Sequence, residues 1–257
     1  MGTNWCRRYR WSQSQMILYV NGDSHTAAAE AVNPHCFAED DSDLYMLGRR
    51  PHPANLAVSW GQQLAKLINA EFYCDAESAA SNARIMRTTR DWIHKNYNRL
   101  DRTVMVIQWS TWEREEWPYE GQYWQVNASG IDHVPVALQD RYKQFVATVN
   151  WERCAEQAHR EIWQFHQELN KKNIQHVFFN GNSNFDSMPN HFNWSGCYMN
   201  PYDAKITYSN LLKTAGFSTV NPQSWHFGPS AHSFWANYVL QYIKQNNLVN
   251  THALPTD

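Results

Sequence analysis

Apolar and polar positions follow two patterns along this chain: short uninterrupted apolar runs, and longer segments with helical spacing. Uninterrupted apolar runs that end at turn residues are typical of buried strands. We predict such strands over residues 16–20, 71–74, 103–109 and 176–179, with a last short one at 219–220. Apolar residues three or four positions apart predict helices over 53–69, 81–96, 138–172 and 230–246, the third of them broken near 148–150.

Strands that alternate with helices predict a parallel sheet covered on both faces, because right-handed crossovers place a helix over each pair of strands. The expected fold class is therefore α/β, a three-layer α/β/α domain with a flavodoxin-like parallel sheet. A chain of 257 residues with 43% hydrophobic content can bury one core, so we predict a single domain over 1–257 that includes an N-terminal extension, 1–15. Long surface loops are expected over 37–53, 113–136 and 181–201.

The charge balance and the lack of long apolar runs limit the partners. The formal net charge is -2 with both signs mixed along the chain, so the sequence indicates no surface for nucleic acid. No run reaches the about 18 apolar residues of a membrane span, and residues 1–15 contain no apolar signal segment. We therefore expect no membrane association and a cytoplasmic protein.

Histidine and cysteine are frequent but scattered. The five cysteines have no C-x-x-C spacing, and the twelve histidines form no His-x-x-x-His pair with acidic neighbours. The spacing therefore predicts free thiols in a reducing compartment, with no metal and no organic cofactor.

The first predicted strand ends in Asn21-Gly22-Asp23-Ser24-His25, followed by Thr26-Ala27-Ala28-Ala29. A serine in a tight turn from strand to helix exposes its hydroxyl and directs its backbone N–H at an anion, which suits a nucleophile of acyl transfer. The alternative is that Ser24 only caps a helix that begins at Thr26.

The other end of the chain places His226 in the loop before the last predicted helix, from which it can reach back over the sheet to Ser24. These two ends resemble the SGNH hydrolase (GDSL-like lipase/esterase) family: Gly22-Asp23-Ser24 matches its first block, and His226 precedes His232 by six residues, as the family's base precedes a second histidine. The resemblance implies Ser24 as nucleophile and His226 as base. The pattern is also similar to virus-encoded SGNH-like proteins, which would allow an association with a virion or host.

The family's middle blocks are present in altered form. The segment 78–85 resembles the second block with alanine in place of the glycine that donates an N–H, so Ala79 or Ala80 is the implied donor, with Asn82 as a supporting residue. The segment 108–111 stands where the third block offers an asparagine, and Ser110 is the nearest replacement. The resemblance thus implies an oxyanion hole formed by the N–H groups of Ser24 and Ala79 or Ala80, helped by Ser110, with Asp23 in support.

The main departure from the family lies just before the base. The family places an aspartate two or three residues ahead of the histidine, where this chain has Gln223 and Ser224. Loss of the acid can cost about four orders of magnitude in rate when the wrong histidine tautomer results. Three alternatives follow: a Ser-His dyad supported by Gln223 or Ser224, a triad with a displaced acid, or an inactive relative.

Thirteen tryptophans are the compositional oddity. Several lie in the polar stretch 109–124, where their rings could line a cleft and stack on a sugar or acyl group, or else pack under a long loop. The predicted substrate cleft contains Trp109, Trp112, Arg114 and Trp225.

The favoured function is hydrolysis of an acyl or acetyl ester, with a small-molecule or glycan ester as substrate. The alternative is a catalytically impaired SGNH-like module that binds glycans, and a Cys- or metal-dependent hydrolase is a less favoured enzyme class.

Overall fold

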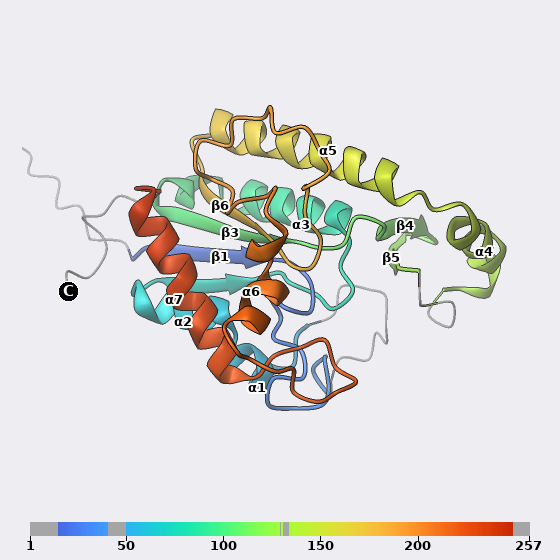
Figure 1. The fold of residues 1–257 in the computed structure, drawn as a ribbon, viewed down its shortest axis with the longest axis horizontal. Helices are drawn as coiled ribbons and strands as arrows, with labels where there is room; N and C mark the ends of the chain where they lie inside the picture. The colour runs from blue at the N-terminus through green and yellow to red at the C-terminus, as the bar shows by residue number, and fades with distance from the viewer. Residues whose placement is uncertain (1–14, 41–49, 129, 131–133, 249–257) are drawn as a thin grey trace, which may run out of the picture.

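A computed structural model describes residues 15–40, 50–128, 130 and 134–248 (Figure 1). The predicted extension lies outside these residues except for Gln15. The core is a four-stranded parallel sheet in the order β2-β1-β3-β6. Its strands are β1 (Ile17–Asn21), β2 (Glu71–Cys74), β3 (Thr103–Trp109) and β6 (Gln175–Asn180). This order is that of the first four strands of a flavodoxin-like sheet, so the predicted α/β class is confirmed.

Alternate residues of the central strands face two separate cores, as a pleated strand requires. Val20 of β1 faces the core built by α2 (Trp60–Leu67) and α7 (Pro229–Gln245). Tyr19 faces the core built by α3 (Asn82–Lys95) and α5 (Trp151–Lys171). Figure 1 shows these helix pairs on opposite sides of the sheet. The predicted three-layer α/β/α arrangement is therefore confirmed.

The helices differ from their predicted bounds where a polar side chain caps the start of a new helix. The predicted helix 53–69 is two helices, α1 (Pro53–Ala57) and α2, because Ser59 Oγ accepts a hydrogen bond from Gln62 N at 3.1 Å and caps α2. The predicted break near 148–150 is confirmed. It separates α4 (Gln139–Thr148) from α5, which Asn150 caps.

The segment 113–136, predicted as a loop, contains an antiparallel hairpin of β4 (Glu115–Tyr119) and β5 (Gln122–Val126). Its turn residues Glu120 and Gly121 have positive φ, 50° and 77°. The hairpin and α4 share a small core of their own, beyond the end of the main sheet in Figure 1: Trp117, Val126, Val134 and Tyr142.

One further prediction needs correction, and one helix was missed. The strand expected at 219–220 is only a single bridge between Thr219 and Phe227, outside the sheet. Helix α6 (Tyr208–Thr214) was not predicted. Short 3-10 helices complete the described elements, at Tyr97–Arg102, Val136–Leu138 and Ala204–Ile206.

The four cysteines within the described residues, Cys36, Cys74, Cys154 and Cys197, are free thiols, as expected. In the described part of the chain, no helix is both long enough and apolar enough to cross a membrane.

Candidate active site

A cavity of about 560 Å³ brings together residues from both ends of the chain. Ser24 follows β1 and His226 precedes α7, and both line this cavity. Of the other predicted site residues, Ala79, Arg114 and Trp225 also line it. From β1 the chain continues to β2 on one side of the sheet and then to β3 on the other. Ligands bind at such a switch point in open α/β sheets.

Ser24 lies in a compact turn and caps no helix. Asp23 O accepts hydrogen bonds from Thr26 N and Ala27 N, both at 3.0 Å, which begins a helical turn. Ala28 and Glu30 then have φ of 55° and 62°, so the turn cannot continue as a regular helix. The helix expected to start at Thr26 is therefore wrong, and the capping alternative for Ser24 is removed with it.

A buried polar network holds this turn against β3. Asp23 Oδ1 accepts from Gln108 Nε2 at 2.6 Å, and Gln108 Oε1 accepts from Thr26 Oγ1 at 2.6 Å. Gly22 permits this approach, because a Cβ there would lie 2.9 Å from Gln108 Cβ. Burial alone would raise the pKa of Asp23, but the neighbouring His25 and Arg114 lower it. Asp23 is thus an ionised support for the turn.

Ser110 does not take the place of the missing asparagine. It is fully buried, its Oγ donates to Asp23 Oδ2 at 3.0 Å and accepts from Arg114 Nη1 at 2.8 Å, and it is not among the residues that line the cavity. Asn82 Oδ1 accepts from Ser110 N at 2.9 Å, so Asn82 orients this network and not the cavity. The predicted oxyanion role of Ser110 is wrong because its hydroxyl is already engaged away from Ser24.

The loop after β2 places the two candidate alanines, Ala79 and Ala80, in different environments. Ala80 N donates to Glu77 O at 3.1 Å, so its N–H is occupied. Ala79 lines the cavity with φ of 65°, the left-handed region that glycine adopts more easily. Among the described residues, none accepts a hydrogen bond from the backbone N–H of Ser24 or Ala79. These two N–H groups are therefore available for an anion.

A buried ion pair stabilises the loop between β2 and α3, which contains Ala79. Arg84 Nη2 lies 2.6 Å from Glu77 Oε2, and Arg84 Nη1 donates to Asp75 O at 2.8 Å. Both contacts tie α3 to the loop, which fixes the position of Ala79.

An acid that the sequence analysis did not identify contacts His226. Glu30 Oε2 lies 2.6 Å from His226 Nδ1, across 196 positions of sequence. Ser224 Oγ donates to the same carboxylate oxygen at 2.6 Å and accepts from His226 N at 2.9 Å. Burial opposes ionisation of Glu30, but the hydrogen bonds from Ser224 and His226 outweigh it and lower the pKa of the carboxyl.

This contact bears on the orientation of the imidazole. A carboxylate at Nδ1 favours the tautomer with the proton on Nδ1, which leaves Nε2 free to accept a proton. Gln223 plays no such part, because it is exposed and its backbone N–H donates to Asn221 Oδ1 at 3.0 Å. The carboxylate beside His226 is therefore that of Glu30, and Ser224 is bonded to both residues.

Asn182 is a second polar residue that the sequence analysis missed. It follows β6, lines the cavity, and its Nδ2 lies 3.0 Å from His25 Nε2. Its Oδ1 accepts from Ser209 Oγ, which fixes the amide orientation with Nδ2 as the donor. The signal that could have found it is its place just after a predicted strand, where parallel sheets carry their ligands.

The tryptophans divide between core and surface. Trp109 is fully buried in the core under α5, so its predicted place in the cleft is wrong. Trp112 stacks on Phe185 with ring centroids 4.4 Å apart, and lines a different cavity beside the hairpin. Trp225 is 73% exposed at the rim of the Ser24 cavity, near Lys213. Of the predicted cleft residues, only Arg114 and Trp225 thus line the same cavity as Ser24.

Several solved structures resemble this chain at low sequence identity. An acetyl xylan esterase (Est2A) from the rumen bacterium Butyrivibrio proteoclasticus is 12% identical with a TM-score of 0.48, over 90% of this chain and 64% of that chain. TesA is 12% identical with a TM-score of 0.47, over 90% of this chain and 99% of that chain. A family two carbohydrate esterase from Clostridium thermocellum, solved with cellohexaose, is 12% identical with a TM-score of 0.40, over 92% and 66%.

The chain therefore spans less than two thirds of the length of the acetyl xylan esterase. No curated protein matches the sequence. The likeness to virus-encoded proteins and the cytoplasmic location stay predictions.

A family model matches residues 47–217, from the segment before α1 to the end of α6. Since this match covers more than half of the chain, the protein belongs to that family, which is described as a family of unknown function (DUF6071).

Proposed function

We propose that this protein is a serine ester hydrolase with Ser24 as nucleophile, His226 as base and Glu30 as the acid that orients the base. The observation that carries the proposal is the 2.6 Å contact between Glu30 Oε2 and His226 Nδ1 in a cavity that Ser24 also lines. The imidazole bonded to a carboxylate, with a serine hydroxyl in the same cavity, supplies the three groups that acyl transfer uses.

The reaction would proceed in two steps. Ser24 Oγ attacks the carbonyl carbon of the ester while His226 Nε2 takes the hydroxyl proton and passes it to the departing alcohol. Water then attacks the acyl-serine, again giving its proton to His226, which returns it to Ser24 as the acid product leaves. Glu30 stabilises the imidazolium that forms in each step.

The oxyanion would be held by donors from three segments. The N–H groups of Ser24 and Ala79 are unoccupied, and Asn182 lines the same cavity. One hydrogen of Asn182 Nδ2 is donated to His25 Nε2, which leaves the second for the oxyanion. Donors fixed before the reaction need no reorganisation as charge develops on the carbonyl oxygen, which is why such sites accelerate acyl transfer. Asn182 thus takes the role first assigned to Ser110.

The rim of the cavity favours an ester whose alcohol part is polar. Trp225 offers an exposed ring, and Lys213 adds a donor beside it. An indole face with neighbouring hydrogen-bond donors suits a sugar ring. We therefore favour an acyl or acetyl ester on a carbohydrate.

The test is hydrolysis of p-nitrophenyl acetate by the wild type and by Ser24→Ala, Glu30→Gln and Glu39→Gln. Glu39 is an exposed carboxylate of the same type and serves as the matched control. We expect saturable turnover in the wild type and Glu39→Gln, none in Ser24→Ala, and a loss of kcat by about two to four orders of magnitude in Glu30→Gln. Labelling by a fluorophosphonate should modify Ser24. Equal rates in the wild type and Ser24→Ala would sink the proposal.

The alternative, an impaired glycan-binding module, rested on the missing acid and asparagine. Glu30 and Asn182 supply both groups from other segments, so the enzyme is favoured. Binding of an acetylated oligosaccharide without turnover would reverse that preference.

A further inference from the structure

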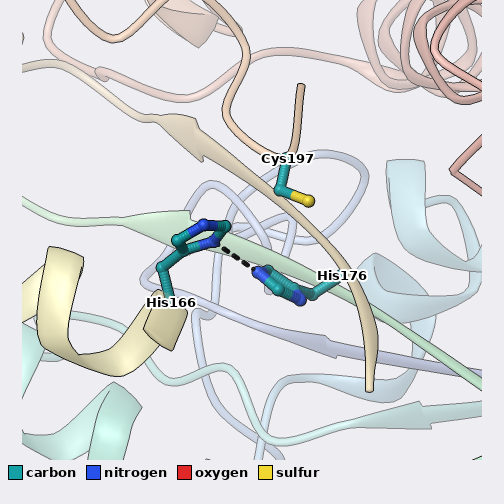
Figure 2. Close-up of side chains that lie close together, drawn as sticks. All are labelled: His166, His176 and Cys197. Carbon is teal, nitrogen blue, oxygen red and sulfur yellow. Dashed lines mark hydrogen bonds between the residues drawn. The ribbon is translucent and has the colours of Figure 1, made fainter. Parts of the chain in front are cut away.

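Two histidines and a cysteine meet on the side of the sheet covered by α5 (Figure 2). His166 lies on α5, His176 on β6, and Cys197 in the segment beside β6. One ligand atom of each residue lies within 4.8 Å of those of the other two. None of the three lines the cavity of Ser24, and the proposed ester hydrolysis does not use them.

The three residues are held by separate, well-anchored elements. Phe178 N donates to Cys197 O at 2.7 Å, and Met199 N donates to Phe178 O at 2.9 Å, so the cysteine segment pairs with β6 like an edge strand. His166 is fully buried and His176 is 2% exposed, so packing restricts both rings. Ligands fixed in this way lose little freedom when they bind an ion.

We propose that His166, His176 and Cys197 bind a zinc ion. Imidazole nitrogen and thiolate sulfur are the ligands zinc prefers, and three protein ligands leave a fourth tetrahedral position for water. In the described part of the chain, no other group of three such residues gathers in this way. The ion would link α5, β6 and the segment around Cys197, and would thereby stabilise the folded chain.

The present hydrogen bonds indicate how the site would accept the ion. His176 Nδ1 lies 2.8 Å from Ile174 O and so carries a proton, which leaves its Nε2 to accept from His166 Nδ1 at 2.8 Å. Zinc replaces this bond between the two rings, and its ligand nitrogens would lie roughly 3.3 Å apart, so the rings must separate slightly. His176 keeps its bond to Ile174 O, the kind of outer contact that orients a ligating imidazole.

The protons balance without a further reagent. The proton on His166 Nδ1 moves to Nε2. Asn170 Nδ2 now lies 2.9 Å from this Nε2 as a donor, and after rotation of the amide its oxygen accepts a hydrogen bond from the new N–H. The Cys197 thiol releases its proton to solvent as the S–Zn bond forms. Burial lowers the pKa of both histidines to about 4, so both rings are neutral near pH 7.

The test uses Co²⁺ as a spectroscopic probe on the full chain after treatment with a chelator. We expect one Co²⁺ per chain with a sulfur-to-cobalt charge-transfer band in the near ultraviolet, displacement by Zn²⁺, and a Tm raised by several degrees at saturating Zn²⁺. Cys197→Ser should lose the band and bind Zn²⁺ at least tenfold more weakly. Cys154→Ser, a partly buried cysteine at the other end of α5, is the matched control and should retain both.

Two further variants make the outcome decisive. His176→Gln keeps all cysteines, and it should weaken Co²⁺ binding even if Cys197→Ser folds poorly. Ser24→Ala should bind Co²⁺ like the wild type, which separates this inference from the proposed hydrolysis. Absence of stoichiometric Co²⁺ binding in the wild type, or a charge-transfer band that persists in Cys197→Ser, would overturn the proposal.

Discussion

At the scale of single residues, Ala79 holds an unfavourable backbone conformation at the candidate site. Its φ of 65° costs a residue with a side chain about 1 kcal/mol, whereas glycine adopts it freely. We expect Ala79→Gly to raise the free energy of unfolding by about 0.5–1 kcal/mol, measured by urea denaturation. Ala80 is not among the residues with positive φ, so Ala80→Gly should lower stability instead. A loss of stability in Ala79→Gly would contradict this account.

Asn182 is expected to act on the transition state more than on substrate binding. Removal of one oxyanion donor costs about 10²–10³ in kcat, so Asn182→Ala should lower kcat by that factor with KM little changed. Asn210 lines the same cavity from α6 and is not one of the proposed oxyanion donors. Asn210→Ala is therefore the control and should retain kcat. A rise in KM at constant kcat in Asn182→Ala would assign this residue to ground-state binding.

Ser24 and His226 could be predicted from the sequence because each has a local signature, a turn after a strand or a loop before a helix. Glu30 has none: it lies in an irregular turn and meets His226 only through the tertiary fold. Ser110 was chosen by its position after β3, but its burial beside Asp23 depends on packing that no pattern reveals.

At the scale of elements, the four sheet strands were predicted because each is a compact run with apolar side chains in its interior. The hairpin of β4 and β5 was missed because it is rich in polar residues and contains Pro118, which argues against a strand. The helix expected after Ser24 failed for a different reason. Its alanines have high helix propensity, but the bonds that hold the turn to β3 override that preference.

The contact between α7 and α2 gives His232 a structural role. Trp60 N, at the start of α2, donates to His232 Nδ1 at 3.2 Å in a fully buried position. His232→Phe would leave this N–H without a partner, so we expect the free energy of unfolding to fall by about 1–3 kcal/mol. His94, exposed on α3, provides the control: His94→Phe should change stability by less than about 0.5 kcal/mol. Equal free energies of unfolding for His232→Phe and His94→Phe would contradict the structural role of His232.

At the scale of the whole molecule, the candidate site exists only in the folded chain. Its groups come from the turn after β1, the loop after β2, the loop after β6 and the loop before α7. These loops meet because parallel strands end at one edge of the sheet. Activity and global folding should therefore be lost together on denaturation.

Buried histidines should make this fold sensitive to mild acid. Burial lowers the pKa of His25 and His159 to about 4, and of His232 to about 3, from an ordinary value of 6.5. Between these values the unfolded chain binds protons that the folded chain does not, so the free energy of unfolding falls as pH falls from 6.5 toward 4. The lowered pKa values of Asp23 and Glu30 act only at lower pH, and the raised pKa of Asp75 acts in the opposite direction.

The measurement is the urea midpoint between pH 7.5 and 5.0, with a chelator present so that metal binding does not contribute. We expect the midpoint to fall as the pH falls, most steeply below pH 6.5. The free energy of unfolding should decrease by up to about 1.4 kcal/mol per pH unit for each such histidine. His159 Nε2 contacts Tyr202 OH at 2.9 Å, and glutamine can keep a bond of this kind without titrating. His159→Gln should therefore show a shallower slope than the wild type. A midpoint independent of pH over this range would mean that these rings bind protons as readily in the folded chain as in the unfolded one, which contradicts the lowered pKa values.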